Sequence, residues 1–311
     1  MFCIASFIVL SILGIFSATN RQLAKEALDC VFHRVTFRPC TTGFDKKMKA
    51  KLVGGLLTRS VPVAKFISKY FEVLSWIFVA LFLLSIAFGV RGLVLYYTTG
   101  SCNGLNSTGL CVFDPKGENI ATSATNCPTS ATSAKDLTLA NVNLSTFAVK
   151  NPNSPEKIVF IGCYECDYSR KAYPVMIKLV DKYAPEFVFA HFPVKGNTNH
   201  LAEVAYCVYQ QSQDKYWQLN DIFFHADKTV METEAFVNDT LTQLGVDVGE
   251  VNACLFDPNT ARTVQNQVTE LEKTGLFGTP TVFINGEALV GPKPYRVYAI
   301  ALRGLFFWLT K

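Results

Sequence analysis

The residues Lys157–Arg170 read KIVFIGCYECDYSR, and this stretch decides the fold that we predict for the chain. Its apolar run, residues 158–161, shows no polar alternation, as expected of a central strand that is covered on both faces. Gly162 ends the run, and Cys163 and Cys166 follow it. The pattern therefore places two thiols in the turn that leaves a buried strand.

A helix is expected to begin at Asp167, directly after the second thiol. Apolar and aromatic residues then recur at helical spacing, at Tyr168, Ala172, Val175, Met176, Leu179, Val180 and Tyr183. The unpaired N–H groups and the dipole of a helix N-terminus favour negative charge. They stabilise a thiolate, which is the form of cysteine that attacks disulfides. The predicted chemistry is thiol–disulfide exchange.

A second informative stretch lies far downstream, at Gly275–Gly291, which reads GLFGTPTVFINGEALVG. Thr279-Pro280 precedes a predicted strand at residues 281–284, an Asn-Gly turn signal and a second short strand at residues 288–290. The bond before a proline is the common site of cis peptides, so the Thr279–Pro280 bond is a candidate cis bond.

Together these two stretches resemble the thioredoxin superfamily, and their spacing resembles its DsbA-like branch. The resemblance covers residues 151–311 and none of the N-terminal third. It implies an α/β thioredoxin-like fold with a helical insert at about residues 198–273. A second parallel strand is predicted at residues 187–194, and a closing helix at Tyr295–Leu309.

The resemblance also implies a function, a thiol–disulfide oxidoreductase that acts on protein thiols or disulfides. Cys163 and Cys166 would be catalytic, and Thr279 and Pro280 would lie beside the bound peptide. No cofactor or metal is expected, because zinc would need two more ligands and the sequence has no second Cys-x-x-Cys. A membrane redox partner that resets the pair is left open.

The chain departs from the family at one position of the helix. DsbA-like chains often read Tyr-Glu-Cys-Pro-Tyr-Cys-Arg, so that Cys166 aligns with the attacking cysteine and Ser169 with the resolving one. A slip by three residues would instead make Cys163 the attacking sulfur, and the sequence leaves this order open. Glu165 and Asp167 flank Cys166 and would oppose a thiolate, which favours a mild exchange role. Ser169 keeps a rival function open, a non-catalytic binding or chaperone module tethered to the membrane.

The N-terminal third is predicted to hold two transmembrane helices, at residues 1–18 and 72–97. A signal peptide or a truncated start is the alternative for the first of them. Between Thr19 and Phe71, 11 basic residues stand against 3 acidic ones, which places the segment 19–71 in the cytosol. We therefore expect a two-pass protein of the cell membrane with an extracytoplasmic C-terminal domain. No nucleic-acid-binding module is evident.

A Ser/Thr/Asn-rich linker is predicted at residues 98–150, and its part at residues 98–135 reads as a flexible spacer. Seven of the ten cysteines follow the second hydrophobic segment, which fits an oxidising compartment. Cys102 and Cys111 flank a Gly/Asn-rich turn and are a candidate local pair. A structural disulfide between Cys207 and Cys254 is favoured over two free thiols. For Cys30 and Cys40 we favour two reduced cysteines over a metal site.

Overall fold

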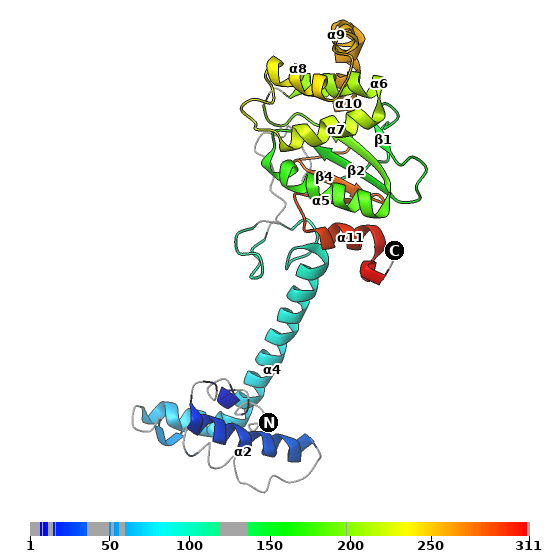
Figure 1. The fold of residues 1–311 in the computed structure, drawn as a ribbon. Coiled ribbons are helices and arrows are strands. Elements are labelled where there is room, and N and C mark those ends of the chain that lie inside the picture. Colours follow the sequence, from blue (N-terminus) through cyan, green and yellow to red (C-terminus); the bar gives the residue numbers. More distant parts are fainter. Residues whose placement is uncertain are drawn as a thin grey trace. The chain divides into compact units, whose positions relative to one another are not determined.

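The computed structural model describes residues 7, 9–11, 15, 17–35, 50, 53–55, 60–107, 109–117, 136–196 and 198–309 (Figure 1). The chain divides into two compact units, residues 1–91 and 92–311, and each is described by itself.

The second unit is built on a five-stranded mixed sheet with the strand order β1-β3-β2-β4-β5. The strands are β1 (Val149–Lys150), β2 (Lys157–Gly162), β3 (Glu186–His191), β4 (Thr281–Ile284) and β5 (Glu287–Val290). Strands β2 and β3 are parallel, and the other neighbours are antiparallel. Strand β3 begins and ends earlier than predicted, because the chain leaves the sheet after His191.

Strand β2 is covered on both faces, as its unbroken apolar run predicts. Ile158 and Phe160 pack in one core, whereas Val159 and Ile161 pack in another on the opposite face. Helix α5 (Asp167–Tyr183) and helix α11 (Tyr295–Arg303) contribute to the first core, and helix α10 (Pro258–Glu272) contributes to the second. Because β2 is the central strand, the turn that follows it lies in the middle of the sheet, at the end where the parallel strands β2 and β3 both finish.

The helical insert runs from α6 to α10 and confirms the prediction for residues 198–273. Its other helices are α6 (Asn199–Gln211), α7 (Gln213–His225), α8 (Glu234–Gln243) and α9 (Val248–Phe256). The predicted disulfide between Cys207 and Cys254 is present and joins α6 to α9. It closes a long segment of the chain within the insert.

The β4–β5 hairpin and helix α11 complete the second unit. The Asn-Gly turn between β4 and β5 uses positive φ angles at Asn285 and Gly286, as a tight hairpin requires. Helix α11 ends at Arg303, before Gly304 with its φ of 86°, and the short 3-10 helix η2 (Phe307–Leu309) follows. The predicted closing helix at Tyr295–Leu309 is thus interrupted.

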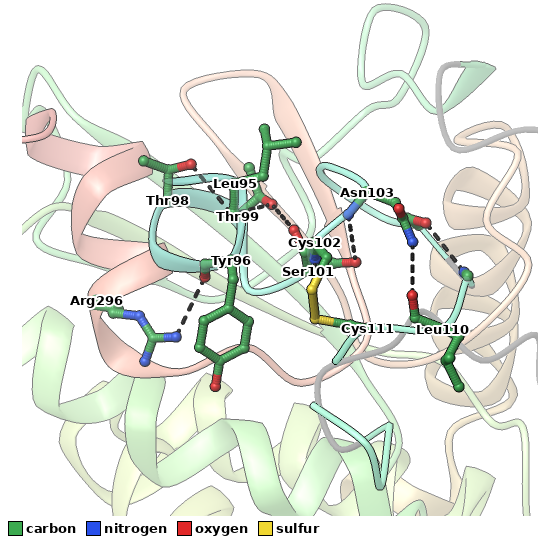
Figure 2. The surroundings of a disulfide bond; sticks show 12 residues. Leu95, Tyr96, Thr98, Thr99, Ser101, Cys102, Asn103, Leu110, Cys111 and Arg296 are labelled. Carbon is green, nitrogen blue, oxygen red and sulfur yellow. Dashed lines mark hydrogen bonds between the residues drawn. A yellow bond between two sulfur atoms is a disulfide. The ribbon is translucent and has the colours of Figure 1, made fainter. Parts of the chain in front are cut away.

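The first part of the predicted flexible spacer, directly after helix α4 (Val61–Thr99), is folded, whereas its residues 118–135 lie outside the described residues. Residues 100–107 and 109–117, here called the Cys102–Cys111 loop, carry that disulfide (Figure 2). Asn106 donates to the Ala288 carbonyl at 2.7 Å and accepts from the Val290 amide at 2.7 Å, so the loop pairs with the free edge of β5. Composition alone predicted flexibility because these long-range bonds have no local sequence signal.

The described part of the first unit is helical and consists mainly of α2 (Ala18–Val35) and the first part of α4. Within the described residues one helical segment, Trp76–Thr99, is long and apolar enough to cross a membrane. The first predicted span, residues 1–18, lies largely outside the described residues and stays a prediction. Cys30 is bonded in a disulfide, so the interpretation of a reduced pair is wrong for that residue, and Cys40 is not described.

Candidate active site

The predicted cysteine turn lies between β2 and α5. The Cys166 amide donates to the Cys163 carbonyl at 3.2 Å, which closes a turn over these four residues. Cys166 is the N-cap residue of α5, and its carbonyl accepts from the Arg170 amide at 2.9 Å. The thiol at the helix N-terminus is therefore Cys166, and Cys163 lies upstream in the turn.

The Thr279–Pro280 peptide bond is cis, and this loop lies against the second cysteine. The Cys166 thiol donates to the Thr279 carbonyl at 3.3 Å. Cys166 is 9% exposed, whereas Cys163 is 0% exposed, so Cys166 is the more accessible sulfur. The structure thus brings together the residues that the two distant stretches predicted.

Cys163 faces a different set of groups from Cys166. Its thiol donates to the Lys195 carbonyl at 3.5 Å and lies 3.8 Å from the hydroxyl of Thr198. Its amide donates to the Ser169 hydroxyl at 3.2 Å. Ser169, fully buried in the first turn of α5, therefore supports the cysteine turn from the position where the family often has a second cysteine.

A hydroxyl and an imidazole extend the surroundings of Cys163 and were missed by the sequence analysis. Nε2 of His191 lies 3.0 Å from Oγ1 of Thr198, and the ring of His191 stacks on Tyr164 with centroids 4.6 Å apart. Nδ1 of His191 is enclosed and has no hydrogen-bond partner among the described residues. Burial lowers the pKa of His191 from 6.5 to about 3, so the ring is neutral at physiological pH.

His191 also lines a small cavity. His191, Tyr164 and Tyr216 line a cavity of about 30 Å³, which also reaches the exposed Thr146 and the half-buried Gln267. A polar cavity of this volume holds about one water molecule. The Thr198 hydroxyl thus lies between the sulfur of Cys163 and Nε2 of His191, and the His191 ring also lines the cavity.

The cysteine turn is held against the helical insert by Arg170 of α5. Its guanidinium donates at 3.0 Å to the carbonyls of both Tyr164 and Phe223, and it also donates to the carbonyl of Ala226. The hydroxyl of Tyr164 donates to Oδ1 of Asn220 at 2.6 Å. These bonds from two faces keep the turn in one conformation.

The carboxylate of Asp167, the residue after Cys166, is paired with two lysines. Lys228 contacts the Asp167 carboxylate directly and Lys195 lies 3.9 Å from it. The hydrogen bond from Lys228 lowers the pKa of Asp167. The expected opposition of Asp167 to a thiolate on Cys166 is thus offset by two lysines. Within the described residues, no cluster of three or more His, Cys, Asp or Glu side chains could hold a metal.

Comparison with known proteins identifies part of the chain. Residues 153–303 match the family model of the DSBA-like thioredoxin domain. The probable disulfide bond formation protein D of Bacillus anthracis is 24% identical over 145 residues, which cover 43% of this chain and 67% of that protein. The thiol-disulfide exchange protein alpha-DsbA2 of Wolbachia pipientis aligns with a TM-score of 0.46 at 21% identity, over 49% of this chain and 83% of that one.

The third similar protein is much longer than the present chain. The Na(+)/H(+) antiporter NhaA 3 of Salinispora tropica is 26% identical over 164 residues, or 51% of this chain. The chain spans only 24% of the length of that antiporter. The part of the present chain that resembles the DSBA-like thioredoxin domain is thus residues 153–303, just under half of its length.

Proposed function

We propose that the DsbA-like thioredoxin domain of this chain exchanges disulfides with protein substrates through Cys166 and Cys163. The observation that carries the proposal is the position of Cys166. Its sulfur lies at the N-terminus of α5 and 3.3 Å from the Thr279 carbonyl, beside the cis bond to Pro280. A helix N-terminus stabilises a thiolate there, and the loop before β4 offers backbone groups to an extended peptide.

The turn geometry supports Cys163 as the partner sulfur. In a turn of this kind the first and last Cα atoms lie within about 7 Å. Disulfides join Cα atoms about 4.4–6.8 Å apart, so a Cys163–Cys166 bond requires little movement. Ser169 cannot take this role because its hydroxyl forms no disulfide.

A disulfide between Cys163 and Cys166 oxidises a substrate in two steps, and the reduced pair reduces a substrate disulfide by the same steps in reverse. A substrate thiolate attacks Sγ of Cys166, the Cys163–Cys166 bond breaks, and Cys163 leaves as a thiolate and gains a proton. A second substrate thiolate then attacks the substrate sulfur of the mixed disulfide, and Cys166 leaves as a thiolate. The substrate has lost two electrons, which the cysteine pair has gained.

Thr198 and His191 would carry the proton that Cys163 gains or loses. Thr198 lies 3.8 Å from the Cys163 sulfur and 3.0 Å from His191. Because burial keeps His191 neutral, its Nε2 would exchange a proton with the Thr198 hydroxyl, which in turn exchanges one with the Cys163 sulfur. In this role Thr198 and His191 affect the exchange only through Cys163 and do not contact the substrate.

We further propose that the domain works outside the membrane and is held there by α4. The segment Trp76–Thr99 is the candidate span, and two disulfides, Cys102–Cys111 and Cys207–Cys254, follow it. Disulfides of this structural kind persist in oxidising compartments. Tyr168, next to Asp167 in α5, and Val230, two residues after Lys228, are exposed and suit an apolar part of a substrate.

Turnover of a peptide disulfide tests the proposal. In a glutathione buffer, the full chain in detergent should reduce a fluorogenic peptide disulfide or oxidise the corresponding dithiol peptide, and Cys166→Ala should abolish that turnover. Cys207→Ala with Cys254→Ala serves as a control, since it should leave the turnover in place at a temperature where the variant is folded. Ser169 favours the rival function, a binding module without turnover; peptide binding with no turnover by the intact chain would establish that function instead.

A further inference from the structure

Exposed apolar side chains after the end of α4 are concentrated in two segments. Of the ten large hydrophobic residues that are exposed within the described part of 100–309, seven lie in residues 110–113 and 305–309. They are Leu110, Val112, Phe113, Leu305, Phe306, Trp308 and Leu309. Two of the other three, Tyr168 and Val230, lie within two residues of Asp167 and Lys228, the ion pair at the start of α5. The clustering therefore needs an explanation apart from catalysis.

The Cys102–Cys111 disulfide fixes the conformation of the first segment, residues 110–113. Cys111 is 1% exposed and bonded to Cys102, whereas its neighbours Leu110 and Val112 are 85% and 80% exposed. Asn103 donates to the Leu110 carbonyl at 3.1 Å, as Figure 2 shows. The loop is thus fixed in a conformation that buries the cystine and presents its apolar neighbours outward.

The first segment contacts the last turns of α4, and the second segment follows α11, a helix that also contacts these turns. The ring of Phe113 lies 5.7 Å from that of Tyr96. Arg296, at the start of α11, donates to the carbonyls of Tyr97 at 3.2 Å and Tyr96 at 3.4 Å, and its guanidinium lies over the Tyr96 ring (Figure 2). Figure 1 shows the loop after α4 and the C-terminal segment after α11 on either side of these turns.

The composition of these segments matches the boundary between lipid tails and head groups. Residues 101–113 and 304–309 contain no charged side chain. Tyr96, Tyr97 and Trp308 are aromatic residues of the kind that gather at membrane interfaces. A surface that surrounds the end of a spanning helix is in contact with lipid, and an exposed apolar patch there is stabilised by burial in the interface.

We propose that residues 110–113 and 305–309 insert into the lipid interface around the outer end of α4. This inference rests on the proposed function in one respect, the passage of α4 through the membrane. With the helix end as a third contact, the two segments hold the domain in a fixed orientation on the bilayer. The Cys102–Cys111 disulfide acts here as the clip that shapes the lipid-contacting loop.

Tryptophan quenching in lipid vesicles tests the proposal. The chain has three tryptophans, so Trp76→Phe with Trp217→Phe leaves Trp308 as the one emitter. The full-length variant is reconstituted into phosphatidylcholine vesicles whose lipids carry bromine near the head group or near the bilayer centre. We expect Trp308 to be quenched more strongly by bromine near the head group and to be shielded from aqueous iodide. Since these vesicles hold no other protein, the quenching reports on lipid.

A companion variant separates this inference from the membrane span itself. Trp217→Phe with Trp308→Phe leaves Trp76, the first residue of the candidate span. Trp76 quenched by brominated lipid together with Trp308 quenched only by iodide would overturn the inference and leave the span intact. An unquenched Trp76 would overturn the span and the inference with it.

A charge placed in the second segment gives a further check. Phe306→Asp should weaken the quenching of Trp308 by brominated lipid at least about twofold, because the interface disfavours a buried carboxylate. Phe256→Asp is the matched control, since Phe256 is 86% exposed on the helical insert, and it should leave the quenching unchanged. Equal quenching in both variants would contradict the proposal.

Discussion

The buried imidazole of His191 should make the stability of the domain depend on pH in a way that one substitution removes. In the folded chain the pKa of His191 is lowered from 6.5 to about 3 because the ring is desolvated. The unfolded chain therefore binds more protons than the folded chain between these two values. Stability is then present above the unfolded pKa and is lost as the pH falls.

The magnitude follows from the two pKa values. Between pH 7.5 and pH 5.0 the full shift corresponds to a loss of about 2 kcal/mol in the free energy of unfolding. His191 as a whole residue is only half-buried, which reduces the expected loss to about 1–2 kcal/mol. The carboxylates with lowered pKa values, such as Asp167, contribute equally in the parent and the variant, so the difference isolates His191.

The assay is urea unfolding of the full chain in detergent micelles at pH 7.5 and pH 5.0. It is followed by the fluorescence of Trp217, which packs near Phe187 and Tyr216, in a background of Trp76→Phe with Trp308→Phe. His191→Gln should lose about 1–2 kcal/mol less on acidification than the parent chain. His200→Gln, which changes an exposed histidine of α6, should behave like the parent. The same pH dependence in His191→Gln and the parent would refute the reasoning.

Three further outcomes are expected. Replacement of Cys207 and Cys254 by alanine should lower the free energy of unfolding by about 4 kcal/mol in urea titrations, because the disulfide joins residues 47 apart; a loss under about 1 kcal/mol would contradict this. Thr198→Val should slow the re-formation of the cysteine disulfide by about tenfold or more in stopped-flow experiments, whereas Thr198→Ser keeps the hydroxyl and should restore the parent rate. Lys228→Gln should lower the rate of alkylation of Cys166 by anionic iodoacetate about twofold relative to neutral iodoacetamide, because it uncovers the neighbouring carboxylate; an unchanged ratio would argue against that charge pairing.

Much of the fold could be predicted because its signals are local. The unbroken apolar run of residues 158–161 indicated a strand with two covered faces, and the Asn-Gly pair indicated the β4–β5 hairpin. The cysteine turn and the loop of Pro280 were predicted separately, and their proximity followed from the family resemblance. These features depend on periodicity and turn chemistry, which a single sequence carries.

The missed parts of the site depend on contacts between distant segments. His191 is the last residue of β3, and the carboxyl ends of parallel strands meet at one edge of a sheet, so its pairing with Gly162 could have been inferred. Thr198 carries no such signal, since it precedes a helix as an ordinary polar residue. The order of the Cys102–Cys111 loop was missed because Asn106 finds its partners on β5, far along the chain.

The assignment of the attacking sulfur depends on the geometry of the cysteine turn, and trapping of mixed disulfides tests it. Cys163→Ala and Cys166→Ala are each expressed as the full chain, and covalent adducts with other proteins are resolved on non-reducing gels. Cys166 lies at the helix N-terminus beside Thr279, so Cys163→Ala should accumulate adducts that reductant releases, and Cys166→Ala should not. Adducts that form only with Cys166→Ala, or with neither variant, would contradict this assignment.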